Sequence, residues 1–155
     1  MKNSVLSAFS DLFSEKIQSL TLILEDTRKR AQAAPGSNVS HSDTSKFNIS
    51  NLAVGIEAQL NLAREALVYL RTLRHSDSPG GMVAIGSLFT IVDIKNGKKL
   101  NFVLLIKGGG EKVQVCDAEI ISITPGAPIA RISISKKVGD ELNFNGRVYR
   151  VIEIT

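Results

Sequence analysis

The stretch GSLFTIVDIKNGKKLNFVLLI, residues 86–106, decides the fold because its β-branched and aromatic residues follow a period of two. Asn96-Gly97 stands near its centre, and this dipeptide is typical of the two-residue turn of a β-hairpin. A second Asn-Gly pair, at residues 145–146, separates LNF from RVYRVIEI. With a further apolar run at 118–124, the pattern predicts a small antiparallel sheet.

One short helix is expected within this sheet domain, which takes in residues 82–155. Pro128 suits the first turn of a helix, because the N–H that it lacks would have no partner there and its φ is already helical. We expect this helix to reach Ser135. Residues 76–81, SDSPGG, have the composition of a linker, so a domain boundary is predicted before the sheet.

Upstream of the linker the apolar period is helical. Apolar side chains recur on one helix face from residue 4 to about 34, and again from Ile49 to Leu73. Pro35 and Gly36 end the first segment. Two such faces can hide each other if the helices fold back as an antiparallel hairpin.

Residues 1–75 are therefore predicted to form an antiparallel coiled-coil arm. Residues 37–46, SNVSHSDTSK, lack an apolar period, which predicts a tip loop near 35–47. About 30 residues with a rise of ~1.5 Å each give an arm of ~45 Å. Its apolar stripe is richest near the base, so the base is expected to be the stable part. The fold class is α+β.

The composition predicts a soluble, intracellular protein. It has 155 residues, a formal net charge of +4 and a single cysteine, Cys116. One cysteine excludes a disulfide framework and a Cys-rich zinc site, and no apolar run approaches the ~20 residues of a membrane span. Asp11 and Glu15 interrupt the apolar residues near the start, so no secretory leader is expected. We expect a reduced, cytoplasmic protein with no membrane partner.

Residues 127–142, APIARISISKKVGDEL, resemble the Gre family of bacterial transcript-cleavage factors. In that family a Ser-Pro-apolar-Ala/Gly-Arg segment leads into a Gly-Lys-x-x-Gly-Asp-Glu turn. The chain matches this pattern at Pro128, Ile129, Ala130, Arg131, Lys136, Val138, Gly139, Asp140 and Glu141. It departs from the pattern at Ala127, Ile132, Ser133 and Ser135, the last of which replaces a glycine.

The resemblance implies a sheet domain similar to FKBP-type prolyl isomerases, joined to the arm. It also implies that this domain docks at the rim of the RNA polymerase secondary channel and that the arm enters the channel. The candidate docking residues are Pro128, Ile129, Ala130 and Arg131. At the arm's tip, Gre factors carry paired acidic residues that help hold a catalytic Mg²⁺, because a hard divalent cation prefers anionic oxygen ligands.

The tip of this chain departs from that pattern. Across residues 35–47 the only carboxylate is Asp43, and its candidate companions at the tip are His41, Lys46 and Phe47. Asp43 is thus only a weak catalytic candidate, and solvation explains His41 and Asp43 better than metal binding does. We expect no resident metal or cofactor, and Mg²⁺ only if the tip acts at the polymerase active centre. Phe47 is predicted to cap the second helix's apolar stripe, with a partner contact as the alternative.

A basic band on the distal arm has two explanations of about equal weight. Its side chains either touch phosphates, including those of nascent RNA, or are simply solvated, because adjacent helix residues spread over different faces. The band consists of Arg28, Lys29 and Arg30.

Two features of the sheet domain are better explained by structure than by chemistry. Cys116 has no nearby His or second Cys and is predicted to be a structural small residue. Residues 108–110, three glycines, open no helix and are predicted to be a flexible hairpin loop rather than a phosphate cradle. With few aromatic residues and no Trp, the domain is not expected to be a prolyl isomerase.

The leading hypothesis is a Gre-like, monomeric RNA polymerase-binding regulator of elongation that lacks strong cleavage activity and is not itself an enzyme. The first rival is a true cleavage-stimulating factor, in which Asp43 and a nearby acidic residue of the arm suffice. The second rival is a coiled-coil adaptor that never meets polymerase.

Overall fold

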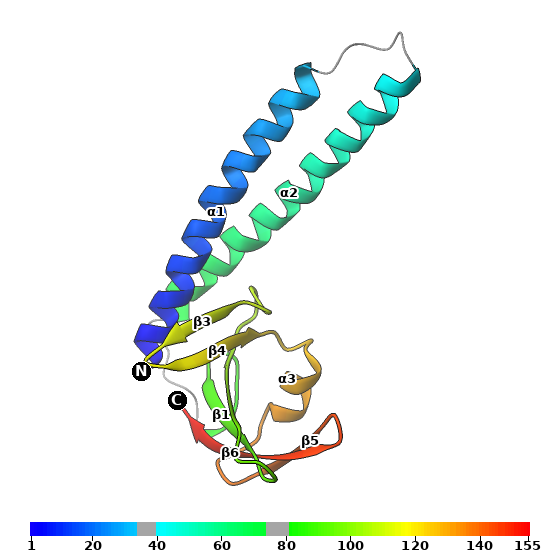
Figure 1. The fold of residues 1–155 in the computed structure, drawn as a ribbon. Helices are drawn as coiled ribbons and strands as arrows, with labels where there is room; N and C mark the ends of the chain where they lie inside the picture. Colours follow the sequence, from blue (N-terminus) through cyan, green and yellow to red (C-terminus); the bar gives the residue numbers. More distant parts are fainter. Residues whose placement is uncertain (34–39, 74–80) are drawn as a thin grey trace.

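The computed structural model describes residues 1–33, 40–73 and 81–155, without the side chains of residues 40–45. Two long helices, α1 (Lys2–Ala33) and α2 (Ser40–Leu73), form a hairpin arm that stands on a six-stranded sheet (Figure 1). The predicted order, a two-helix arm followed by a sheet domain with one short helix, is confirmed. None of the described helices is long and apolar enough to span a membrane.

Six strands make up the sheet, in the order β3-β4-β2-β1-β6-β5. Both predicted Asn-Gly hairpins are present, since β1 pairs with β2 and β5 pairs with β6, each antiparallel. Asn145 and Gly146 both have positive φ, as a tight hairpin turn requires. The strands are β1 (Leu88–Asp93), β2 (Lys99–Leu104), β3 (Lys112–Val115), β4 (Ala118–Ile123), β5 (Glu141–Phe144) and β6 (Arg147–Ile154).

The sheet is mixed, which corrects the prediction of a wholly antiparallel one. β4, predicted at 118–124, lies parallel to β2 and pairs Phe102 with Ile121. The reason is β3, which the sequence analysis missed. It runs back along the outer edge of the sheet and pairs antiparallel with β4, so β4 points the same way as β2.

Both faces of the sheet are covered, which explains why β1 and β2 read as nearly continuous apolar runs. On one face, Leu88 and Val103 join the base of the arm in a buried cluster that includes Phe9 and Phe13. On the other face, neighbouring residues such as Phe89 and Phe102 pack with α3 (Pro128–Ser133). Successive side chains of each strand therefore serve two different cores.

The helical seam of the arm is confirmed along its lower two thirds. Its buried apolar residues are Val5, Leu6, Phe9, Phe13 and Leu24 on α1, and Ile56, Leu60, Ala63, Ala66, Leu70 and Leu73 on α2. Towards the tip the seam thins, as predicted. Ile23 and Leu52, which the sequence analysis assigned to the stripe, are instead 50% and 58% exposed.

The second helix begins at Ser40, which corrects the prediction that residues 37–46 form a loop and that the helix starts near Ile49. Extending an existing helix adds one hydrogen bond for each residue fixed, so a polar stretch can continue the helix without an apolar face. Residues 34–39, which include the start of the predicted tip loop at 35–47, and residues 74–80, which include most of the predicted linker at 76–81, lie outside the described residues.

Candidate functional site

The candidate docking segment forms α3, and its four residues divide between core and surface. Pro128 occupies the first turn, as predicted, and both Pro128 and Arg131 are exposed. Ile129 and Ala130 are 6% and 0% exposed and belong to the core on the α3 face of the sheet. Of the four candidate docking residues, only Pro128 and Arg131 therefore expose their side chains to solvent.

The helix ends earlier than predicted, at Ser133 rather than Ser135. Ser133 donates its Oγ hydrogen bond to the carbonyl of Ile129 at 2.7 Å and is fully buried. Ser135 has a φ of 68°. A glycine adopts this left-handed conformation without steric cost, which explains why the family pattern has glycine at this place.

The rest of the family-like segment, residues 136–141, is a structural turn. The backbone N–H of Lys137 donates to Oδ2 of Asp140 at 2.8 Å, and Gly139 has a φ of 96°. The Gly139 N–H donates to the carbonyl of Val151 at 2.8 Å, which ties the turn to β6. The resemblance in these residues is thus a resemblance of fold rather than of chemistry.

At the tip, the structure describes the surroundings of two of the four candidate side chains. Lys46 is exposed, and Phe47 is 67% exposed. The prediction that Phe47 caps the apolar stripe is therefore wrong. Phe47 lies on the side of α2 away from the seam, and the alternative, a partner contact, stays a prediction. The side chains of His41 and Asp43 lie outside the described residues.

The basic band on α1 does not form one continuous patch. Arg28 reaches across the arm, and its Nη2 lies 3.1 Å from Oε2 of Glu57 on α2. Arg30 pairs along its own helix with Asp26, at 2.8 Å. In the described part of the chain, Lys29 has no recorded ion pair and is exposed, which leaves it the band's one side chain without an intramolecular ionic partner.

The junction between arm and sheet corrects the prediction that residues 108–110 form a flexible hairpin loop. The glycine run follows β2, and Gly108 lies against the arm: a Cβ built on it would come within 2.4 Å of the Phe13 ring and 2.8 Å of the Ala66 side chain. Ser122 binds the loop from beneath, donating its Oγ hydrogen bond to the Gly108 carbonyl at 2.6 Å. This loop is held rather than flexible.

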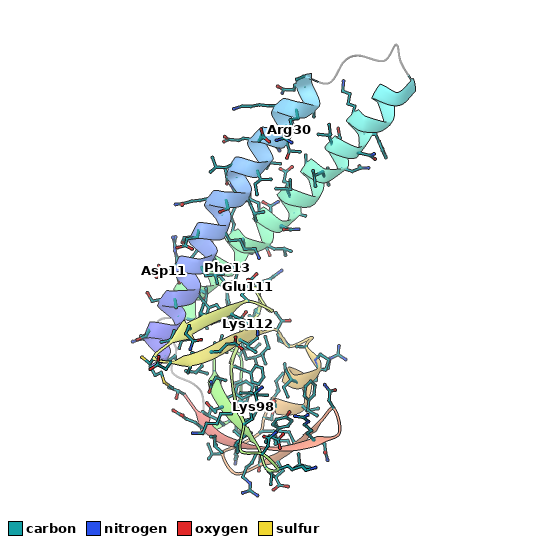
Figure 2. All side chains as sticks on the ribbon, viewed as in Figure 1. Asp11, Phe13, Arg30, Lys98, Glu111 and Lys112 are labelled. Atoms are coloured by element: carbon teal, nitrogen blue, oxygen red, sulfur yellow. The ribbon has the colours of Figure 1, made fainter. Side chains whose placement is uncertain are left out.

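Two ion pairs cross the same junction. Glu111 pairs with Lys16 of α1, and Lys107 pairs with Glu65 of α2 at 2.9 Å. Figure 2 shows Phe13 and Glu111 where the arm meets the sheet, and Arg30 near the far end of α1. The loop that contains residues 107–111 thus contacts both α1 and α2, which fixes the direction of the arm relative to the sheet.

Among the described residues, no group of three or more His, Cys, Asp or Glu side chains is placed to hold a metal ion. Cys116 is exposed in the turn between β3 and β4, with a φ of 48°, so it is not packed in either core of the sheet domain. It is exposed because β3 and β4 form a hairpin that places Cys116 at its outer end.

Burial raises the pKa of the Tyr69 phenol above its ordinary value of 10.0, so Tyr69 stays protonated at neutral pH.

A cavity of about 780 Å³ opens where the two Asn-Gly turns meet. It is lined by charged, amide and aliphatic residues, among them Asp93, Asn96 and Arg147. A prolyl isomerase needs an aromatic-lined pocket, and this lining is of another kind.

No protein-family model matches the chain, and no curated protein matches it. Among solved structures it is similar to the GreA factor homolog 1 (Gfh1) protein of Thermus thermophilus, with a TM-score of 0.39 and 18% identity over 96% of this chain and 95% of that one. It is also similar to a structure of the transcription factor Gfh1, with a TM-score of 0.37 and 19% identity over 95% of this chain and 93% of that one. For Gfh1 of Thermus aquaticus the TM-score is 0.37 and the identity 14%, over 96% of this chain and 94% of that one. At this level of similarity, function has to be argued from the chain's own residues.

Proposed function

We propose that this chain binds RNA polymerase and regulates transcription elongation, with the sheet domain at the rim of the secondary channel and the arm inserted. The observation that carries the proposal is an arm with a fixed base and an acid-poor tip. α1 has 32 residues, which corresponds to an arm of about 48 Å. The resemblance of residues 127–142 to the Gre family supports the choice of partner.

The arm is proposed to act by occupying the channel rather than by supplying chemistry. Metal-assisted hydrolysis needs carboxylates that hold the ion and orient a water molecule. Residues 35–47 supply Asp43 alone. The chain is thus proposed not to be an enzyme, and Mg²⁺ to belong to the polymerase.

The rival cleavage factor would need a second carboxylate from the arm beside Asp43. The acidic residues next in line are Asp26 and Glu57, which pair with Arg30 and Arg28. Asp26 lies seven residues before Ala33, about 10 Å below the end of α1. An ion-paired carboxylate that far from the tip is poorly placed to share a metal ion with Asp43, which favours occupancy over cleavage.

The test of occupancy uses a backtracked elongation complex with excess full-length protein. We expect no shortened transcript above the intrinsic rate of the polymerase, together with reduced cleavage by a competing Gre factor. Asp43→Ala should leave this inhibition largely unchanged, because obstruction does not depend on tip carboxylates. Robust cleavage that disappears in Asp43→Ala would instead establish the rival enzyme-stimulating function.

The docking test compares two charge reversals on the sheet domain. Arg131→Glu should weaken the capture of core polymerase, because it reverses a charge on the proposed contact helix without touching the core. Lys98→Glu, on the exposed turn between β1 and β2, is the matched control and should leave capture unchanged. If the wild-type chain captures no core polymerase at all, the adaptor rival gains and the proposed function fails.

A further inference from the structure

The two outer faces of the arm differ sharply in charge. On α2, residues 47–63, FNISNLAVGIEAQLNLA, contain a single charged residue, Glu57, and Arg28 neutralises it at 3.1 Å. The outer face of α1 carries exposed charges along its length, from Asp11 and Glu15 to Asp26 and Lys29. α2 therefore presents more than four turns of helix to solvent without an unpaired charge.

A second row of exposed side chains, apolar except for two asparagines between Phe47 and Asn61, runs along this neutral face. Its members follow one another at alternating steps of four and three residues, the spacing of a coiled-coil seam. They lie on the side of α2 opposite the buried Ile56, Leu60 and Ala63, and all of them are exposed. The row consists of Phe47, Asn51, Val54, Ala58, Asn61, Glu65 and Val68, of which Phe47, Val54 and Val68 are 67%, 66% and 61% exposed.

We propose that this row, from Asn51 to Asn61, pairs with the same row of a second copy of this chain in an antiparallel α2–α2 contact. The residues themselves select this register. We place two such rows antiparallel, with their crossing point level with residue 56 along each helix. Asn51 then stands opposite Asn61 of the second copy, and Val54 stands opposite Ala58. Two-fold symmetry repeats both pairs, so Val54 and Ala58 meet each other and Asn51 and Asn61 meet each other, while Phe47 lies at the end of the contact, opposite Glu65.

The chemistry of the face favours a copy over another partner. An Asn side chain both donates and accepts hydrogen bonds, so Asn51 and Asn61 can satisfy each other without an external group. A buried amide pair also penalises a shifted register, because a shift leaves donors and acceptors unpaired. The chain has a formal net charge of +4, which opposes self-association, and a contact through a face without unpaired charges adds no local repulsion to it.

The uncharged part of the row ends before Glu65. Glu65 pairs with Lys107 of the sheet domain at 2.9 Å, which leaves the neutral part about four turns long. A contact of this length between two helices is small by the standards of obligate dimers, so a weak, reversible dimer is expected. The inference does not rest on the proposed function. It adds to it that self-pairing covers the arm's α2 face, so a paired arm is unavailable to any other partner.

The first test measures self-association of the full chain by sedimentation velocity over a series of concentrations, in a Cys116→Ser background that excludes disulfide artefacts. We expect the sedimentation coefficient to rise with concentration. Val54→Glu should weaken the association at least tenfold, because it places two carboxylates in the neutral contact. The matched control is Leu22→Glu on α1, an equally exposed apolar residue at 67%, which should leave association unchanged. Circular dichroism confirms that both variants keep their helices.

The second test reads the register. In the Cys116→Ser background, a mixture of Val54→Cys and Ala58→Cys chains should form a heterodimeric disulfide faster than either chain forms a homodimer. A chain that stays monomeric at every concentration overturns the proposal, and so does equal weakening by Leu22→Glu. If the chain is monomeric and Val54→Glu alone weakens capture of polymerase, the face belongs to the polymerase contact and self-pairing is wrong.

Discussion

The base and the distal half of the arm belong to the same two helices, but they differ in what their buried side chains pack against. At the base, Phe9 and Phe13 share one buried cluster with Leu70 of α2 and with Val103 and Leu105 of the sheet domain. The distal half has a separate small cluster of three buried residues, Leu24, Ile56 and Leu60. The base is therefore part of a domain core, whereas the distal half depends on one helix pairing with the other.

The difference teaches how the molecule separates positioning from contact. The base fixes the direction of the arm through the Gly108 loop and two ion pairs. The outer side chains of the distal half do not take part in the buried seam. Phe47 and Val54 can therefore be exposed without weakening the core. The base thus positions the arm, and the distal half carries the exposed apolar side chains.

The largest expected effect comes from emptying the base. Phe13 is 2% exposed, and Phe13→Ala should destabilise the chain by about 3–5 kcal/mol through lost burial and a residual cavity. Leu24→Ala in the distal cluster should cost about 2 kcal/mol, the low end for such truncations, because the thin seam there can collapse. Urea unfolding measures both. Equal losses would contradict the difference between the two regions.

The next effect tests whether the arm is locked onto the sheet. Gly108→Ala should cost about 2–4 kcal/mol, because it adds left-handed strain at a φ of 78° to a clash with Phe13 and Ala66. Gly110→Ala is the matched control, since it has a φ of 91° and open space around it. It should cost only the strain, about 1–2 kcal/mol. Unfolding free energies give the comparison, and equal costs for the two variants would show that Gly108 does not carry the junction.

The sequence reveals the architecture wherever a period extends over many residues. The helical repeat predicts the arm, and the period of two with its Asn-Gly turns predicts the hairpins β1–β2 and β5–β6. Shorter signals were missed. The strand β3 has only four residues, although Val113 and Val115 alternate with polar neighbours, and without it the parallel pairing of β2 with β4 could not be foreseen.

The candidate site was less predictable because exposure depends on contacts distant in sequence. Only polarity distinguishes, from the local sequence, the buried Ile129 from the exposed Arg131. At Phe47 polarity gives the wrong prediction, because this apolar side chain is exposed. The glycine run looked flexible because its neighbours, Phe13 and Ala66, lie more than 40 residues away. The family-like turn at 136–141 is recognisable because its side chains maintain the fold.

A smaller effect, of opposite sign, is expected from strengthening the distal half. Gly55 lies within α2, and a Cβ added there would meet nothing within 4 Å. Gly55→Ala should stabilise the helix by about 0.5–1 kcal/mol, because alanine loses less backbone entropy. Hydrogen exchange should slow in residues 47–63 and remain unchanged at the base. Slower exchange throughout the chain would mean that the two regions unfold as one unit.

The smallest expected effect concerns the ion pairs of the two regions. Lys16 and Glu111 at the base have side chains 38% and 28% exposed, whereas Arg28 and Glu57 in the distal half are 55% and 50% exposed. The Glu111 backbone is already held, since its N–H donates to Oγ of Ser122 at 3.0 Å, so forming the base pair orders less of the chain. Double-mutant cycles to alanine should give a coupling of about 0.5–1 kcal/mol for the base pair and about 0.3 kcal/mol or less for the distal pair. Both couplings should fall at 1 M salt, and the distal pair should lose more of its coupling because it is better solvated. A distal coupling larger than the basal one would mean that Arg28 and Glu57, rather than the apolar seam, hold the far end of the arm together.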